Sequence, residues 1–222
     1  MTRRGVLYVV WGDGIDELLD RSIESVRRIH PELGIEVERL PGGSTLLDKA
    51  RMMEWTPFDE TLYLDADTVV MDRLDFAFER AARFGLACSI CECPWARRYG
   101  GLTGDVVEYN TGVLFFDRKA RPVFDRWAEV VGSIDSSLLF YQDGELCNMP
   151  YNDQAGFADA MHELGFAPFV LPYNWNLRPR GHRSFWGPIK IWHDALPVPD
   201  GLERWNENQI APENPIQYTE LR

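Results

Sequence analysis

The 222-residue sequence predicts an α/β fold with a mostly parallel, Rossmann-like central sheet flanked by helices. Short continuous apolar runs, typical of strands buried on both faces, alternate with segments whose apolar residues recur at helical spacing. The early runs end in turn-forming clusters rich in glycine, proline or aspartate. Because consecutive parallel strands are joined by right-handed helical crossovers, this order predicts a parallel sheet.

The first 67 residues read as strand, helix, strand, helix and strand. The predicted strands are 6–11, 35–40 and 62–64, and the predicted helices are 15–29 and 45–55. The charged N-terminus followed by an apolar run superficially resembles a signal peptide. We interpret it as the first strand, because glycines and an aspartate cut the run short and no small-residue cleavage site follows.

The rest of the chain continues the alternation less regularly. We predict further strands at 85–91, 109–117, 166–171 and 189–192, and helices at 74–84, 120–131 and 152–164. Segments 92–108 and 133–151 have no clear period and read as loops. Proline-rich, polar residues 195–222 suggest a tail on the surface. With no repeat and no linker, the sequence predicts one domain over residues 1–222.

Composition narrows the classes of partner. A formal net charge of −12 argues against a protein that binds nucleic acid or anionic membrane, since both need a basic surface. No apolar stretch approaches the length of a membrane span. Four cysteines in 222 residues do not make a disulfide framework, which favours a reducing, cytoplasmic compartment.

Two carboxylates one residue apart, Asp65 and Asp67, lie in an apolar stretch over residues 61–70. Side chains alternate along a strand, so residues two apart face the same side and can share a divalent cation. Two carboxylates leave most of a coordination sphere open. His193, at the end of the last predicted strand, is the best candidate for a third ligand.

An ordered set of segments then resembles the family 8, glycogenin- and galactosyltransferase-like glycosyltransferases. The matching pieces are Tyr8, Lys49 and segments 58–67, 110–117, 152–154, 171–176 and 191–193. Each piece is a weak signal, but the seven occur in the expected order. The resemblance implies a GT-A (nucleotide-diphospho-sugar transferase) fold and a hexosyltransferase that transfers a sugar from a nucleotide-sugar, with retention of configuration.

The resemblance also implies a metal cofactor. It makes Asp65, Asp67 and His193 ligands of Mn²⁺ or Mg²⁺ that bridges the diphosphate of the donor, most simply a UDP-sugar. A cation there neutralises the diphosphate and stabilises the charge that builds on the leaving nucleotide. The acceptor, whether sugar, protein or small molecule, stays open.

Further site residues follow from the same resemblance. Asp153 and Gln154 are expected beside the reacting carbon, with Asn110 lining the sugar pocket, and Asp153 is the candidate that steadies an oxocarbenium-like charge. Tyr8 and Asp13 are expected at the base, and Ala66 against the ribose. The complete set of expected substrate-binding residues is Tyr8, Asp13, Lys49, Ala66, Thr111, Gly112, Arg178 and Arg180.

One departure from the family pattern concerns the phosphates. The family usually follows its histidine with a glycine and a phosphate-contacting lysine, which residues 195–205 replace here. A loop before the last predicted strand offers candidates for the missing cation: Arg178, Arg180, His182 and Arg183. A solvated basic loop explains them equally well.

Two alternatives remain open, and a third is disfavoured. Residues 62–69 also fit the first motif of haloacid-dehalogenase-type phosphatases, although about 60 residues of strand and helix precede it and the later acidic motif is missing. The absent lysine also fits a catalytically inactive nucleotide-sugar-binding protein. A nucleotidyltransferase would need a basic, glycine-rich phosphate loop at the first turn, which is acidic here.

The sequence also contains half of a zinc pattern. Cys88, Cys91 and Cys93 lie close together in the chain, but no second pair follows at a suitable spacing. The sequence therefore favours plain strand thiols over a zinc site.

Overall fold

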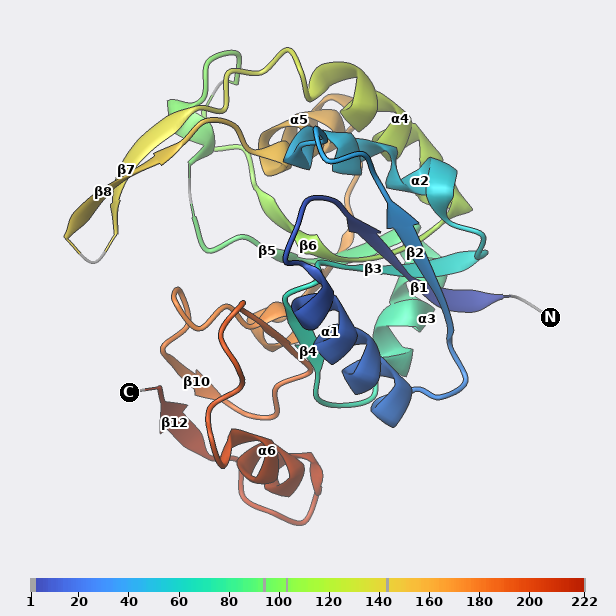
Figure 1. The fold of residues 1–222 in the computed structure, drawn as a ribbon, viewed down its shortest axis with the longest axis vertical. Coiled ribbons are helices and arrows are strands. Elements are labelled where there is room, and N and C mark those ends of the chain that lie inside the picture. Colours follow the sequence, from blue (N-terminus) through green and yellow to red (C-terminus); the bar gives the residue numbers. More distant parts are fainter. Residues whose placement is uncertain (1–2, 94, 103, 143, 222) are drawn as a thin grey trace.

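A six-stranded sheet forms the centre of the molecule (Figure 1). The computed structural model describes residues 3–93, 95–102, 104–142 and 144–221. The sheet has the order β2-β1-β3-β6-β5-β9, with β1 at Arg4–Val10, β2 at Gly34–Arg39, β3 at Glu60–Leu64, β5 at Leu86–Ile90, β6 at Tyr109–Asp117 and β9 at Phe169–Leu171. Strand β6 runs antiparallel to β3 and β5, whereas the other neighbouring pairs are parallel. The predicted α/β fold with a mostly parallel sheet is confirmed.

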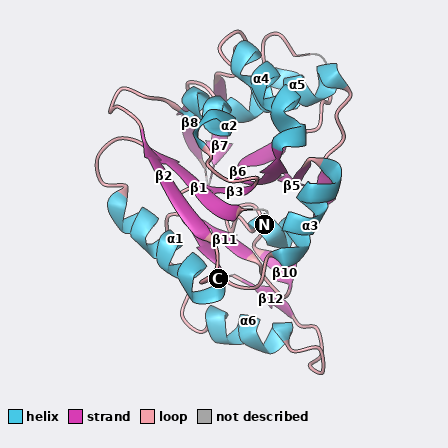
Figure 2. Ribbon diagram, turned by 90° about the vertical axis from the view of Figure 1, so that its right-hand side faces the viewer, coloured by secondary structure: helices cyan, strands magenta, loops and turns pink. Residues whose placement is uncertain are grey.

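Helices cover both faces of this sheet, as Figures 1 and 2 show. Helices α1 (Asp16–Ile29) and α3 (Asp75–Phe84) pack on one face, and α2 (Met52–Trp55), α4 (Arg121–Val130) and α5 (Asp153–Leu164) pack on the other. Strand β1 explains the arrangement, because Val6 and Val10 belong to the α1–α3 core while Leu7 and Val9 belong to the opposite core. A strand buried on both faces needs a continuous apolar run.

The segment predicted as one helix over 45–55 is divided in two. A 3-10 helix, η1 (Leu46–Arg51), precedes the short helix α2. Thr45 caps η1 by accepting a hydrogen bond from the Leu47 amide, and the Asp48 side chain accepts one from the Thr45 amide. The apolar spacing located the element correctly but did not distinguish the two helix types.

The acidic pair separates two strands within the apolar stretch over residues 61–70. Strand β3 ends at Leu64, the chain turns through Asp65-Ala66-Asp67, and β4 begins at Thr68 (Thr68–Val70). Thr68 closes the turn by donating from its amide and hydroxyl to the Asp65 carbonyl. The two carboxylates therefore lie in a turn, and strand alternation is not what places them.

The last predicted strand belongs to a separate small sheet. Strand β11 (Ile191–His193) pairs antiparallel with β4 rather than joining the central sheet. Its position opposite β4 brings the C-terminal part of the chain to the end of β3.

Segment 133–151, predicted as a loop, contains a β-hairpin. Strands β7 (Leu138–Gln142) and β8 (Glu145–Met149) pair antiparallel and extend away from the rest of the chain (Figure 1). Sequence analysis missed it because apolar residues on its outer face, such as Leu139 and Tyr141, hide the alternation of a half-buried strand. The Asp143-Gly144 dipeptide is a hairpin signal that the sequence does carry.

The segment after Ala195, predicted as a tail, contains helix α6 (Leu202–Ile210) and strand β12 (Tyr218–Glu220). Strand β12 pairs with β10 (Ser184–Trp186). Leu202 joins a third apolar cluster with residues of β4 and β11, so the segment packs against the small sheet. Within the described residues, no helix has both the length and the apolar character needed to cross a membrane.

Candidate functional site

The three predicted metal ligands meet at the end of β3. Pairing of β11 with β4 places His193 opposite Thr68, next to Asp67. His193 Nε2 lies 3.3 Å from Asp67 Oδ1 and 3.8 Å from Asp65 Oδ2. One ligand atom from each of the three residues lies within 4.8 Å of the others. The turn supplies two ligands and the small sheet supplies the third.

Asn176 holds the ring of His193. Its Oδ1 lies 2.7 Å from His193 Nδ1, and its Nδ2 donates to Asn110 Oδ1 at 2.8 Å. Because the Asn176 amide nitrogen is committed to Asn110, its oxygen accepts from Nδ1–H. The lone pair of His193 Nε2 is therefore left facing the two aspartates, as in a ligand oriented by its neighbours.

Gly112, on β6, lies directly beneath this group. Its carbonyl accepts a hydrogen bond from the Asp65 amide at 2.9 Å, and its amide donates to Asn110 Oδ1 at 2.9 Å. A Cβ added here would overlap His193 Cε1 and lie 2.5 Å from Asp65 Oδ2. The absence of a side chain allows Asp65 and His193 to approach each other.

Lys49 connects Asp65 to Asp153. Its Nζ lies 2.9 Å from Asp65 Oδ1 and 3.5 Å from Asp153 Oδ2, and its side chain is almost fully buried. Burial opposes the charge on Lys49, but the charges of Asp153 and Asp65 outweigh it and raise the lysine pKa to about 12. Lys49 is therefore a permanent cation between two carboxylates.

Asp153 and Asp65 each accept a further hydrogen bond from a hydroxyl. Thr111 Oγ1 donates to Asp153 Oδ2 at 2.7 Å, and Tyr63 Oη donates to Asp65 Oδ1 at 2.7 Å. Asn152 caps α5 by accepting from the Gln154 amide, which places Asp153 and Gln154 in the first turn of the helix. The cap and the hydroxyl hold Asp153 in a fixed position.

Asp67 is strongly acidic. Burial favours its neutral form, but when the His193 ring is protonated, its hydrogen bond and charge outweigh burial and lower the Asp67 pKa to about 2. The carboxylate is thus ionised at neutral pH and available to a cation.

A cavity of about 360 Å³ opens beside the three predicted ligands. Its lining comes from the acidic turn, the end of β11, the loop after β9, the segment after β5 and the β7–β8 hairpin. The lining residues are Asp67, Glu92, Cys93, Trp95, Phe140, Tyr141, Gln142, Arg178, Arg180, Gly181, His193, Asp194 and Ala195. The cavity joins the candidate metal group to the predicted arginines.

Both arginines are engaged by acids. Arg178 Nη1 lies 2.8 Å from Glu92 Oε1, and Arg180 Nε lies 3.5 Å from Asp194 Oδ2. They line the cavity together with Asp67 and His193, but each already has an anionic partner.

The other predicted site residues differ in burial and position. Ala66 is buried within the acidic turn, and Gln154 is buried with its Nε2 donating to Cys91 Sγ at 3.4 Å. Asp13 is exposed in the turn between β1 and α1. The structure gathers most of the predicted site around β3, β6 and the start of α5.

Tyr8 requires a correction. Its side chain is fully buried, and its hydroxyl lies 2.9 Å from Ser22 Oγ on α1. Tyr8 belongs to the core cluster that α1 and α3 form with the sheet. That core covers the ring completely, so in this structure no surface of the ring is open to a nucleotide base.

Sequence reasoning missed Tyr63, Asn176 and Glu92. Tyr63 precedes Asp65 by two residues, and strand periodicity gave a signal that it faces the same side. Asn176 belongs to the matched segment 171–176, yet its contact with His193 spans 17 residues and has no local signature. Glu92 was visible only as an acidic loop residue.

Comparison with known proteins shows which structures share this fold. No family model matches the sequence, and no curated protein matches it as a relative. Among solved structures, the glycosyltransferase GlyE of Streptococcus pneumoniae TIGR4 superposes with a TM-score of 0.55 at 15% identity, over 93% of this chain and 60% of GlyE. The chain therefore spans less than two thirds of that protein.

Two further structures cover the chain similarly. The galactosyltransferase LgtC, solved with donor and acceptor sugar analogs, has a TM-score of 0.54 at 17% identity, over 91% of this chain and 94% of LgtC. Mouse xyloside xylosyltransferase 1 has a TM-score of 0.57 at 13% identity, over 89% of this chain and all of that chain (100%). At these identities the comparison shows the fold, and the chain has the GT-A fold of glycosyltransferases.

Proposed function

We propose that this chain is a metal-dependent glycosyltransferase that transfers a sugar from a nucleotide-sugar, a UDP-sugar, to an acceptor with retention of configuration. The observation that carries the proposal is the meeting of Asp65, Asp67 and His193 at the end of β3, beside a cavity. Ligands of open α/β sheets bind at the carboxyl ends of strands, which is where this group lies.

The residues present fit a hard divalent cation. Two carboxylates and one imidazole suit Mn²⁺ or Mg²⁺ better than thiophilic metals. His193 is already oriented by Asn176, and Gly112 leaves the group room. A cation held by Asp65, Asp67 and His193 would offset the charge of a diphosphate and of the leaving nucleotide.

The chain's own side chains supply the other parts of the reaction. Arg178 and Arg180 border the cavity next to Asp67. They would release their present partners, Glu92 and Asp194, and bind phosphate oxygens instead. The arginines and the metal together would offset the negative charge of the donor's diphosphate.

Asp153 acts as an electrostatic stabiliser in this proposal. Lys49 Nζ and the Thr111 hydroxyl both contact its carboxylate and hold it in place. A fixed carboxylate beside Asn110 and Gln154 would stabilise positive charge at the sugar ring as the bond to the diphosphate breaks.

The test compares hydrolysis of UDP-sugars with and without Mn²⁺ in the unaltered chain, in Asp67→Ala and in the exposed control Asp200→Ala. We expect Mn²⁺-dependent release of UDP that Asp67→Ala abolishes and the control retains. Equal release by Asp67→Ala would refute the assignment. Metal-dependent UDP binding without turnover of any donor would favour the inactive binding protein instead.

A further inference from the structure

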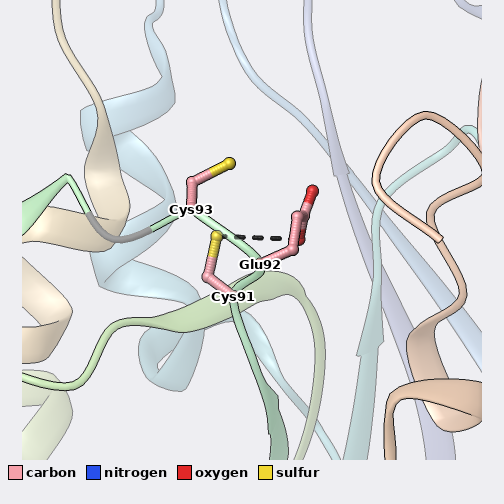
Figure 3. A group of neighbouring side chains, drawn as sticks. All are labelled: Cys91, Glu92 and Cys93. Carbon is pink, nitrogen blue, oxygen red and sulfur yellow. Dashed lines mark hydrogen bonds between the residues drawn. The ribbon is translucent and has the colours of Figure 1, made fainter.

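Three potential ligands gather immediately after β5. Cys91, Glu92 and Cys93 follow the last residue of the strand, and Figure 3 shows their side chains grouped together. One ligand atom from each lies within 4.8 Å of the others, and Cys91 Sγ donates to Glu92 Oε2 at 3.8 Å. In a continuing strand Glu92 would face away from both cysteines, so the end of the strand is what brings the carboxylate round.

Glu92 is held in this position from the other side. Its Oε1 binds Arg178 Nη1 at 2.8 Å, which leaves Oε2 turned towards Cys91. It also packs tightly against Gly181, where an added Cβ would lie 2.6 Å from Glu92 Cγ. The carboxylate is therefore placed by its surroundings and not by chance exposure.

The thiols are fixed and reachable. Gln154 Nε2 donates to Cys91 Sγ at 3.4 Å, which anchors the buried thiol to α5. Cys93 lines the candidate cavity, and Cys91 and Cys93 both line a second cavity of about 260 Å³. Cys88, by contrast, is completely buried. An ion and its water ligand have a path to Cys91 and Cys93.

We propose that Cys91, Glu92 and Cys93 bind a thiophilic divalent cation of the Zn²⁺ class, at a site separate from the Asp65–Asp67–His193 group. Two thiolates and one carboxylate oxygen give three ligands, and water completes the tetrahedron that zinc adopts. Each thiol releases its proton to solvent when the metal–sulfur bond forms. Tetrahedral Zn–S bonds of about 2.3 Å put two sulfurs roughly 3.8 Å apart, which the observed grouping reaches with small side-chain movements.

The two groups of ligands are expected to prefer different metal ions. Soft thiolates select Zn²⁺ over Mn²⁺ and Mg²⁺, whereas the two aspartates and the histidine accept the harder ions. The thiol site needs no glycosyl transfer, but through Cys93 and the Glu92–Arg178 pair it borders the proposed donor cavity. A bound ion would tie the end of β5 to the Arg178 loop through Glu92 and to α5 through Gln154.

Co²⁺ is the probe that tests this site, because thiolate ligands give Co²⁺ an intense near-ultraviolet charge-transfer band. The full chain, fully reduced, is titrated with Co²⁺ and then with Zn²⁺. We expect a thiolate band that saturates at one equivalent and that Zn²⁺ displaces. No thiolate band, or a band that Zn²⁺ leaves unchanged, would overturn the proposal.

Variants locate the ligands. Cys93→Ser should lose the two-thiolate band and weaken Zn²⁺ binding about 10- to 100-fold, the range typical of altered metal-site shells. Cys147→Ser, a free cysteine on the hairpin, and Asp67→Ala should both keep the band. An undiminished band in Cys93→Ser, or its loss in Cys147→Ser, would place the metal elsewhere. If Cys93→Ser misfolds by circular dichroism, Glu92→Gln must reduce Zn²⁺ affinity instead, and unchanged affinity there also contradicts the site.

Discussion

Lys49 shows how single residues set the charge of the candidate site. It is buried between Asp65 and Asp153, so each of the three charges depends on the others. Burying a charge is costly unless it is paired, and removing one partner leaves the rest uncompensated. The trio therefore stabilises the fold and fixes Asp153 at the same time.

Replacing Lys49 should be destabilising. We expect Lys49→Met to lower the free energy of unfolding by about 3–5 kcal/mol, because the buried Asp153 and the partly buried Asp65 lose their counter-charge. Urea denaturation measures the change. The double variant Lys49→Met, Asp153→Asn should be less destabilised than the sum of the single variants, and strict additivity would show that Lys49 and Asp153 are not coupled.

Asn176 is the residue that should affect metal binding without being a ligand. Asn176→Ala leaves all three candidate ligands but removes the acceptor for His193 Nδ1. We expect Mn²⁺ affinity to fall about 10- to 100-fold. Calorimetric titration with Mn²⁺ provides the measurement, with the exposed Asn148→Ala as the matched control. Unchanged affinity in Asn176→Ala would mean that His193 needs no such support.

At the scale of elements, β6 shows what sequence patterns predict well. Its bounds, Tyr109–Asp117, are those predicted, because a long apolar run has few alternative structures. Segment 45–55 was located but given the wrong helix type, and the hairpin at 138–149 was missed because its outer face is apolar. Local periodicity reflects which side chains are buried, and its signal is lost where exposed positions also carry apolar residues.

Strand β6 also contributes Gly112, which lies against two of the candidate metal ligands. Gly112→Ala should nearly abolish Mn²⁺ binding, because the added methyl group overlaps His193 and crowds Asp65. Gly132→Ala is the control, since an added Cβ there meets nothing within 4 Å and the backbone has no special conformation. Mn²⁺ titration of both variants separates the outcomes, and full Mn²⁺ binding by Gly112→Ala would contradict the close approach described here.

At the scale of the whole molecule, the C-terminal segment supports the candidate site. Helix α6 contributes Asn206, whose side chain accepts from the Ile189 amide at 2.5 Å and donates to the Ile189 carbonyl at 2.9 Å. Ile189 leads into β11, which carries His193. The last part of the chain thus helps to position a residue of the metal group.

Removing that support should have two effects. Asn206→Ala leaves the buried Ile189 backbone groups without partners, and we expect a loss of about 1–3 kcal/mol in the free energy of unfolding. Mn²⁺ affinity should fall as well, because β11 is less firmly held. Asn208→Ala, exposed on the same helix, should change neither quantity. Full Mn²⁺ affinity in a destabilised Asn206→Ala would show that α6 does not support His193.

The sequence predicted the three candidate metal ligands better than the residues around them. Asp65, Asp67 and His193 were named from their types and order in the chain, and the structure brings them together. The burial of Tyr8 against α1 depends on how the helix packs on the sheet, which its position in the sequence does not show. The contact of Asn176 with His193 depends on how β11 meets β4, which no local pattern records.

The most direct test of the central claim is the melting temperature with UDP and Mn²⁺, separately and together. A ligand that binds only the folded state at 100 times its Kd adds about 2.7 kcal/mol, which for a chain of this size raises the melting temperature by roughly 5–10 °C. The account predicts a shift that needs both compounds in the unaltered chain and is lost in Asp67→Ala. An equal shift in Asp67→Ala, or no combined shift for any nucleoside diphosphate tested in place of UDP, would contradict a metal-dependent nucleotide-sugar site at Asp65, Asp67 and His193.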